Sequence, residues 1–407
     1  MRFFCALLAC MLVLTPVLSA RAEVSARSDA DYDPPLKDLA AAKGFYIGLC
    51  LSPNQLGDKA YLSLLSSQFN TTTCTNEMKA YSLLDQQASR RSPDGMPRMN
   101  WTMADKMVSW ARDNGLKVRG HVLTWDAYMT KWFFHEGYDE KKPVASREVI
   151  LARMENYITQ TVTHFEQAFP GTVWCWDVVN EAMGDSAGEY QPGDARHIRT
   201  VRNGAPNPFY QYVGDDYVAY SFLYARNAVE ALGADIKLFY NDYNMLYPDK
   251  RGAARYLVES INTFAKDDAG EYHRLIDGIG MQGYMGGYGV QQGCMSDDLI
   301  ENTRKSIEAY AAMGLEVHIT EMALRNYDKS LSEQHAAFYK KMFQMLGGIN
   351  EALGKTVLTD VTIWGVSDVT PNAWNEYTWK LNSTYGGILT EKGERKTAFD
   401  AMYDALK

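Results

Sequence analysis

The chain has 407 residues, 46% of them hydrophobic, and its formal net charge is −9 at pH 7. This hydrophobic content excludes an intrinsically disordered protein, because disordered chains lack enough apolar surface to form a core. The acidic balance and the lack of a basic patch argue against a ligand held through phosphates, so no nucleic acid partner is expected. A neutral substrate fits this charge better.

Residues 1–22 have the pattern of a secretory signal peptide. Arg2 supplies a positive start, Phe3 to Leu18 is nearly continuously apolar, and Ala20 and Ala22 offer small residues for cleavage. The apolar run is shorter than the roughly 20 residues of a membrane span, and no later stretch approaches that length. We therefore expect a periplasmic or secreted protein without a membrane span. Residues 23–40 should be a loose segment before one folded domain, residues 41–407.

Four cysteines remain after the first 22 residues: Cys50, Cys74, Cys175 and Cys294. They are too few for a disulfide framework in a chain of this length, and no CxxC spacing indicates zinc. We expect at least three of them to be small buried hydrophobic residues, with one disulfide left open. No metal and no cofactor are expected.

A short β-rich run followed by a segment with helical spacing recurs along the chain. The β-rich runs are Gly44–Cys50, Phe69–Asn76, Lys117–Trp125, Val173–Glu181, Ile236–Asn244, Ile276–Tyr284, Leu315–Glu321 and Asp360–Asp368. Helical spacing appears between them, for example at Ala104, Val108 and Ala111 and over 217–231. Such alternation gives parallel strands joined by right-handed crossovers. The sequence thus predicts a single α/β domain, a closed (β/α)₈ TIM barrel, with an open doubly wound sheet as the alternative.

Polar or aromatic residues end most of these strands, which places them at the face where such barrels carry their active sites. Glu181 ends the fourth run and Glu321 the seventh, where a carboxylate has no packing role. Strands four and seven lie across the barrel mouth from each other. Two carboxyl groups that flank one bond are what glycoside hydrolysis requires. The sequence therefore predicts a glycoside hydrolase site at this face.

The segments around both acids resemble the signatures of glycoside hydrolase family 10, the (β/α)₈ endo-β-1,4-xylanases. The two segments are Trp176-Asp177-Val178-Val179-Asn180-Glu181-Ala182 and Ile319-Thr320-Glu321. The likeness continues in order through Asn76-Glu77-Met78-Lys79, Val118-Arg119-Gly120-His121, Tyr240-Asn241-Asp242-Tyr243-Asn244, Gly278-Ile279-Gly280-Met281-Gln282 and Trp364-Gly365-Val366-Ser367-Asp368.

This resemblance implies that Glu181 is the acid/base and Glu321 the nucleophile of a retaining double displacement on xylan or xylo-oligosaccharides. It implies further residues that bind the substrate by hydrogen bonds or aromatic packing: Asn76, Lys79, His121, Trp125, Asn180, Gln282, Trp364 and Trp374. Among them, Asn180 would bind a 2-hydroxyl, Gln282 would help to position the nucleophile, and Trp125 would form the floor. We expect the enzyme to act as a monomer.

Several positions depart from the family pattern. Thr75 stands in place of a Glu, and Ala323 in place of an acid after the nucleophile. After Trp125 the family usually has His, a small polar residue and Gln, whereas this chain has residues 126–128, Asp-Ala-Tyr. Tyr284 replaces a His that bonds the nucleophile, and its hydroxyl can still donate to a carboxylate. The acids are kept, so the changes point to altered specificity: decorated or short xylo-oligosaccharides, or another β-glycoside. A non-catalytic carbohydrate-binding barrel is the third possibility.

Three other features have alternative explanations. Residues 184–188 match the G-x-S-x-G of serine esterases, but no helix can begin soon after them. Residues 278–283 match the dinucleotide fingerprint G-x-G-x-x-G, but their glycines lie within a strand and at its end. The loop 184–214 carries Arg196, Arg199 and Arg202, which either belong to a solvated scaffold or bind acidic sugar substituents such as glucuronic acid.

Overall fold

The structure is a computed structural model that describes residues 23–184, 198–285, 295–368 and 385–407. In these ranges, eight parallel strands form a ring that closes where the first and last strands in the order pair with each other. The strands around the ring are β11 (Leu358–Ile363), β1 (Tyr46–Leu51), β2 (Thr71–Cys74), β3 (Lys117–Thr124), β4 (Val173–Asn180), β7 (Lys237–Asp242), β8 (Gly278–Met281) and β10 (Glu316–Leu324). The predicted closed barrel is confirmed, and the open sheet is excluded.

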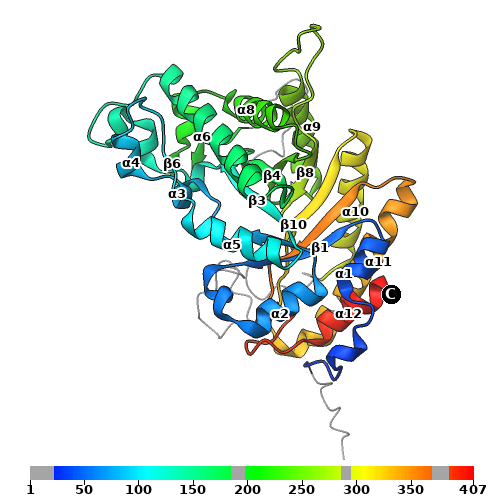
Figure 1. Cartoon of the computed structure of the whole chain (residues 1–407). Coiled ribbons are helices and arrows are strands. Elements are labelled where there is room, and N and C mark those ends of the chain that lie inside the picture. The colour runs from blue at the N-terminus through cyan, green and yellow to red at the C-terminus, as the bar shows by residue number, and fades with distance from the viewer. Residues whose placement is uncertain (1–22, 185–197, 286–294, 369–384) are drawn as a thin grey trace, which may run out of the picture.

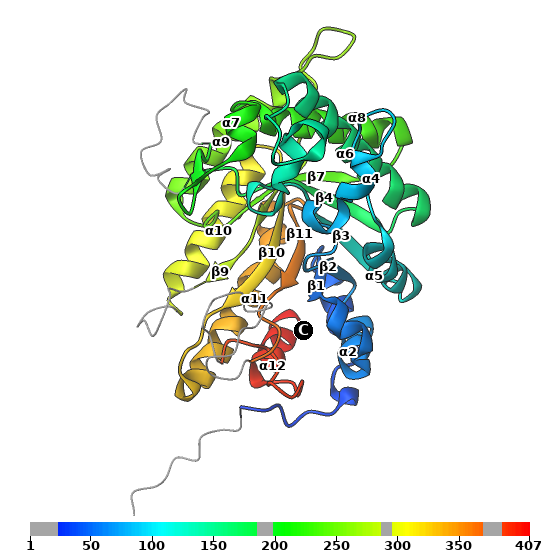
Figure 2. The same ribbon diagram turned by 90° about the vertical axis from the view of Figure 1, so that its left-hand side faces the viewer.

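A long helix follows each barrel strand, and these helices surround the strands (Figure 1, Figure 2). They are α2 (Lys59–Gln68), α5 (Thr102–Asp113), α6 (Arg147–Ala168), α8 (Tyr217–Leu232), α9 (Pro248–Asn262), α10 (Asp297–Ala312), α11 (Ser332–Leu353) and α12 (Thr397–Leu406). The shorter elements are α1 (Leu36–Ala42), α3 (Ala80–Leu83), α4 (Gln86–Arg90), α7 (Pro208–Tyr212), the antiparallel hairpin of β5 (Val201–Arg202) and β6 (Ala205–Pro206), and β9 (Tyr284–Met285) beside β10.

Local sequence explains why these segments fold as they do. Strand β10 is buried at every position after its first, because the barrel interior covers one face and helices cover the other. Helix α5 buries Ala104, Met107, Val108 and Ala111, which share one face at helical spacing. Helix α2 begins after Asp58, whose carboxylate accepts hydrogen bonds from two main-chain N–H groups of the first turn.

The prediction that residues 23–40 are loose is wrong. Val24 pairs with Lys396 in an antiparallel bridge, and helix α1 begins inside the segment. The ring of Tyr32 lies edge-on to Phe399 and Tyr403 of α12, with centroid distances of 5.2 and 5.1 Å. Only 2% of Tyr32 is exposed. The segment is ordered because its aromatic and apolar side chains pack on the C-terminal helix, which lies far away in the sequence.

Two further expectations can be compared with the described residues. Cys50, Cys74 and Cys175 are buried thiols, as predicted, whereas Cys294 lies outside the described ranges. Burial raises the pKa of the Cys175 thiol well above its ordinary value, which keeps it protonated. Across the described ranges, no helix has the length and hydropathy needed to cross a membrane.

Candidate active site

The two predicted catalytic carboxylates lie at the carboxyl ends of barrel strands. Glu181 directly follows β4, and Glu321 is the sixth of the nine residues of β10. Both are largely withdrawn from solvent, with exposed fractions of 5% and 7%. The backbone of Glu181 has a φ of +53°. Residues other than glycine rarely adopt this conformation, and such residues cluster at active sites. This is the face at which barrels of this class carry their chemistry.

A row of three carboxamides connects the two acids. Gln282 donates from Nε2 to Glu181 Oε1 at 2.9 Å and to Asn180 Oδ1 at 3.3 Å. Asn241 donates from Nδ2 to the same Asn180 oxygen at 3.0 Å and to Glu321 Oε1 at 3.2 Å. These contacts join both carboxylates in one connected network.

Glycine at position 280 is required for this network. A Cβ built on Gly280 would lie 2.4 Å from Asn241 Oδ1 and 2.9 Å from Arg119 Nη2. Any larger residue would therefore displace Asn241 from the carboxylate it contacts. The glycines of the segment 278–283 serve packing inside the barrel, and the segment forms strand β8 followed by the short β9. This arrangement does not match the strand–turn–helix geometry of a dinucleotide site.

Tyr284 hydrogen-bonds Glu321, the predicted nucleophile. Its hydroxyl donates to Glu321 Oε2 at 2.5 Å. Burial raises the pKa of Glu321, and the negative charge of Glu181 adds to this effect, whereas His121 and the Tyr284 hydrogen bond oppose it. Burial and the charge of Glu321 also raise the pKa of Tyr284, so the phenol remains a donor.

We expect Tyr284→Phe to lower kcat/KM by about one to two orders of magnitude, because a hydrogen bond to a charged group contributes about 1.5–3 kcal/mol. Loss of this bond should also raise the pKa of Glu321. A carboxylate nucleophile must be ionised to act, so if Glu321 has this role the acid limb of the pH–rate profile should move to higher pH. Initial rates between pH 4 and 8 measure both effects. An unchanged rate and limb would show that the bond has no role in catalysis.

The structure corrects the expected role of Gln282. Its side chain contacts Glu181 and Asn180, so its amide holds the predicted acid/base and not Glu321. Only its main-chain oxygen reaches the other acid, accepting from Glu321 N at 2.8 Å. The resemblance placed Gln282 in the site but could not decide which carboxylate its amide contacts.

The predicted sugar-binding residues from β2 and β3 lie together. Lys79 donates from Nζ to Asn76 Oδ1 at 3.0 Å and lies over the rings of Trp125 and Tyr128, at 5.1 and 4.5 Å from their centroids. His121 lies edge-on to Trp125 at 5.9 Å. Trp364 directly follows β11 and is buried. Trp374 lies outside the described residues.

A buried charge pair inside the barrel fixes His121. Asp177 accepts from Arg119 Nε at 3.0 Å and contacts His121 Nδ1 at 2.8 Å. Burial tends to raise the pKa of Asp177, but the charge of Arg119 and the hydrogen bond from His121 outweigh this effect and lower the pKa below its ordinary value. Removing one partner of such a pair leaves an uncompensated buried charge, which lowers the free energy of unfolding by about 3–5 kcal/mol. The pair thus sets the orientation of the imidazole at the floor of the site.

Sequence reasoning gave Asn241 and Asp126 no role of their own in the site, and it named Arg202 only as scaffold or as a contact for acidic substituents. Arg202 donates from Nη1 to Glu181 Oε2 at 2.7 Å and from Nε to Asp126 Oδ2 at 2.9 Å. The signal for Asn241 was its place at the end of a strand within a family segment. For Asp126 the signal was its departure from the family residue. Nothing in the sequence pairs Arg202 with either acid.

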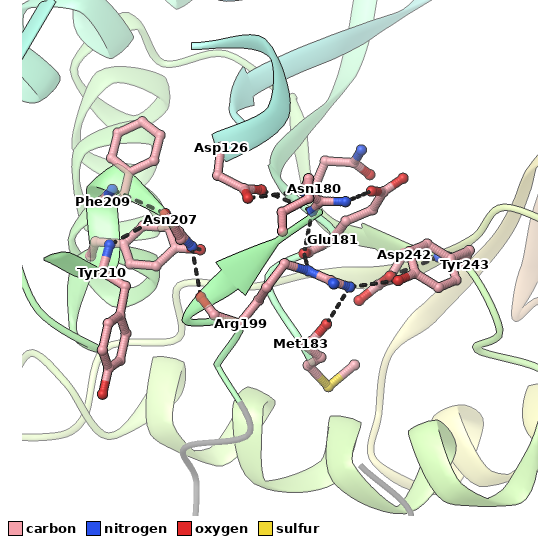
Figure 3. A network of polar contacts seen from close by, with 12 residues as sticks. Asp126, Asn180, Glu181, Met183, Arg199, Asn207, Phe209, Tyr210, Asp242 and Tyr243 are labelled. Carbon is pink, nitrogen blue, oxygen red and sulfur yellow. Dashed lines mark hydrogen bonds and ion pairs between the residues drawn. The ribbon is translucent and has the colours of Figure 1, made fainter. Parts of the chain in front are cut away.

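Arg199 belongs to the scaffold and is not free to bind acidic substituents. Its guanidinium donates to Glu181 O at 3.2 Å, Met183 O at 2.9 Å and the Tyr243 hydroxyl at 2.6 Å. Figure 3 shows the side chain between Met183 and Tyr243, with Asn207 bonded to its main-chain oxygen. Arg196 and part of the segment 184–188 lie outside the described residues.

Comparison with known proteins agrees with this geometry. Residues 35–405 match the model of glycosyl hydrolase family 10. The chain is 32% identical to an endo-1,4-beta-xylanase B from Butyrivibrio fibrisolvens over 89% of this chain and 52% of that protein. The chain thus spans about half the length of this relative.

Solved structures give the same relationship. One similar structure is an endo-1,4-beta-D-xylanase from Clostridium thermocellum, whose family 10 and carbohydrate-binding modules were solved with xylohexaose. It superposes on this chain with a TM-score of 0.76 and 27% identity. The match covers 92% of this chain and 68% of that one. An intracellular xylanase mutant from Thermoanaerobacterium saccharolyticum, solved with xylotetraose, gives a TM-score of 0.70 at 28% identity, covering 91% and 98%. With its closed barrel, its two strand-end carboxylates and a family match across nearly its whole length, the chain belongs to glycosyl hydrolase family 10.

Proposed function

We propose that this protein hydrolyses β-1,4-xylosidic bonds in xylan or xylo-oligosaccharides, with retention of anomeric configuration. The observation that carries the proposal is the carboxamide row that joins Glu181 to Glu321 at the barrel mouth. The relatives named as xylanases, and the related structures solved with xylo-oligosaccharides, support the choice of substrate.

The reaction proceeds by double displacement. Glu321 attacks the anomeric carbon as a carboxylate and forms a covalent ester, while Glu181 gives its proton to the leaving sugar oxygen. Water then attacks the ester, and Glu181 takes the proton of that water as a base. Asn241 and Tyr284 hold the two oxygens of the nucleophile, so the attacking carboxylate is oriented before substrate arrives.

Substrate profiling tests the proposal. Reducing-sugar release is measured on plain xylan, arabinoxylan, xylo-oligosaccharides and aryl β-glycosides, and NMR follows the first anomer formed. Cleavage of xylan to β-configured products is expected. Cleavage restricted to decorated or short oligosaccharides would indicate the changed specificity that the altered residues at positions 75 and 126–128 suggest. Binding of xylan without cleavage of any β-glycoside would overturn the proposal.

We also propose that the mature protein is exported. The support is the sequence of residues 1–22, which combines an early Arg2, an apolar run and small residues at Ala20 and Ala22. Expression of the full chain in a bacterial host should give a periplasmic or extracellular protein whose first residue lies near position 23. Cytoplasmic protein that keeps residues 1–22 would contradict this proposal.

A further inference from the structure

The acid/base Glu181 has a cationic partner from an element outside the barrel. Arg202, in strand β5 of the hairpin, donates from Nη1 to Glu181 Oε2 at 2.7 Å and from Nη2 to Glu181 O at 3.1 Å. The remaining side-chain oxygen of Glu181 accepts from the neutral Gln282. In the described part of the chain, Arg202 is the cation that contacts this carboxylate directly.

Asp126 holds the guanidinium of Arg202 in place. It accepts from Nε at 2.9 Å and from Nη2 at 2.8 Å, in the bidentate geometry that suits arginine and a carboxylate. The side chains of Asp126, Glu181 and Arg202 are exposed by only 3%, 7% and 17%. Little solvent therefore screens this charge triad.

The backbone that carries Arg202 is fixed at both ends. A tight turn with positive φ at Asn203 and Gly204 closes the hairpin of β5 and β6. On the other side, Arg199 binds the main-chain oxygens of Glu181 and Met183. Figure 3 shows Arg199 reaching towards Met183, and Asp126 approaching Glu181 from the turn that follows β3. The guanidinium is thus held beside the acid before substrate binds.

We propose that Arg202, oriented by Asp126, is a positioning residue that sets the pH range over which Glu181 works as acid and base. This inference rests on the proposed function. A guanidinium beside a carboxylate favours the ionised form. Arg202 thus aids the second step, in which Glu181 acts as a base. It limits the first step at high pH, where Glu181 must still carry a proton.

The other groups around Glu181 do not substitute for this charge. Glu321 of β10 is itself an acid, and the charge of Glu181 raises its pKa. Burial raises the pKa of the Tyr128 and Tyr284 phenols, and the negative charge of Glu181 raises it further. Lys79 and His121 lower the pKa of Glu321, the other carboxyl group of the pair. Burial opposes the charge of Arg202, but the hydrogen bond to Asp126 and the charge of Glu181 raise its pKa, so it stays cationic.

The test compares the wild type with Arg202→Met, which keeps the length of the side chain and removes its charge. The alkaline limb of kcat/KM on unsubstituted xylo-oligosaccharides should move to higher pH by about one unit or more, the shift typical of losing an adjacent opposite charge. On a 2,4-dinitrophenyl β-xylobioside, whose leaving group needs no proton, no such limb is expected. Arg202→Lys should keep the limb near its wild-type position.

Controls separate the charge effect from a loss of structure. Arg202→Gln provides a second neutral variant, and Arg112→Met removes an exposed arginine of α5 that pairs with the adjacent Asp113. The Arg112 variant should keep the wild-type profile. Equal alkaline limbs in wild type, Arg202→Met and Arg202→Gln would overturn the inference, whatever the change in kcat.

A direct titration distinguishes this inference from the proposed function. ¹³C NMR of the Glu181 carboxyl, recorded without substrate, should show a higher pKa in Arg202→Met and Arg202→Gln than in the wild type. If the wild type cleaved no β-glycoside while this shift was present, the proposed function would fail and the electrostatic coupling would stand. An unshifted titration in both variants would refute the coupling.

Discussion

Glu321→Ala is expected to reduce hydrolysis of xylo-oligosaccharides by at least about four orders of magnitude, because the variant lacks the carboxylate that we propose forms the covalent ester. Sodium azide should restore cleavage of a substrate with an activated leaving group, since a small anion can occupy the space left by the carboxylate. The restored product should be the α-configured glycosyl azide, formed by a single inversion. Initial rates and NMR of the product measure both effects.

Glu316→Gln is the matched control for this variant, because Glu316 is the first residue of the same strand and lies at the opposite end of the barrel. It should keep near wild-type activity, which shows that loss of turnover depends on the position of the acid in β10. Hydrolysis of xylan by Glu321→Ala at a rate close to that of the wild type would rule out Glu321 as the nucleophile.

Glu181→Ala should divide the two steps of the reaction. Cleavage of xylo-oligosaccharides should fall by about 10²–10⁴-fold, the usual contribution of a general acid, because a sugar alkoxide leaves poorly. The first step should stay close to the wild-type rate for a dinitrophenyl leaving group, and the second step should become limiting. A rapid burst of dinitrophenol followed by a slow steady state, measured by stopped flow, is the expected result.

Azide also tests the role of Glu181. It should accelerate the slow second step of Glu181→Ala and give the β-configured glycosyl azide, because it attacks the covalent ester and a second inversion follows. The two variants are thus expected to give azides of opposite configuration. An equal rate loss on good and poor leaving groups would show that Glu181 acts in some way other than proton transfer.

The sequence could predict the barrel and its two acids because both leave local patterns. Each strand is a short β-rich run between helical segments, and Glu181 and Glu321 end hydrophobic runs at positions that match family signatures. Boundaries differ by a few residues: β10 extends to Leu324, whereas the predicted run ended at Glu321. The extension is favoured because Ala323 and Leu324 pair with the short strand β9.

The sequence alone therefore determined the fold class, and it predicted the face that carries the site and the two carboxylates there. Only the tertiary structure decided which partners hold them: Arg202 contacts Glu181 across 21 residues and Asp126 across 76. It also showed that Tyr32 packs on Phe399, where a loose segment was expected. The physical reason is the same in each case. Strand and helix patterns depend on neighbours along the chain, whereas a charge pair or an aromatic contact depends on which distant segments barrel closure brings together.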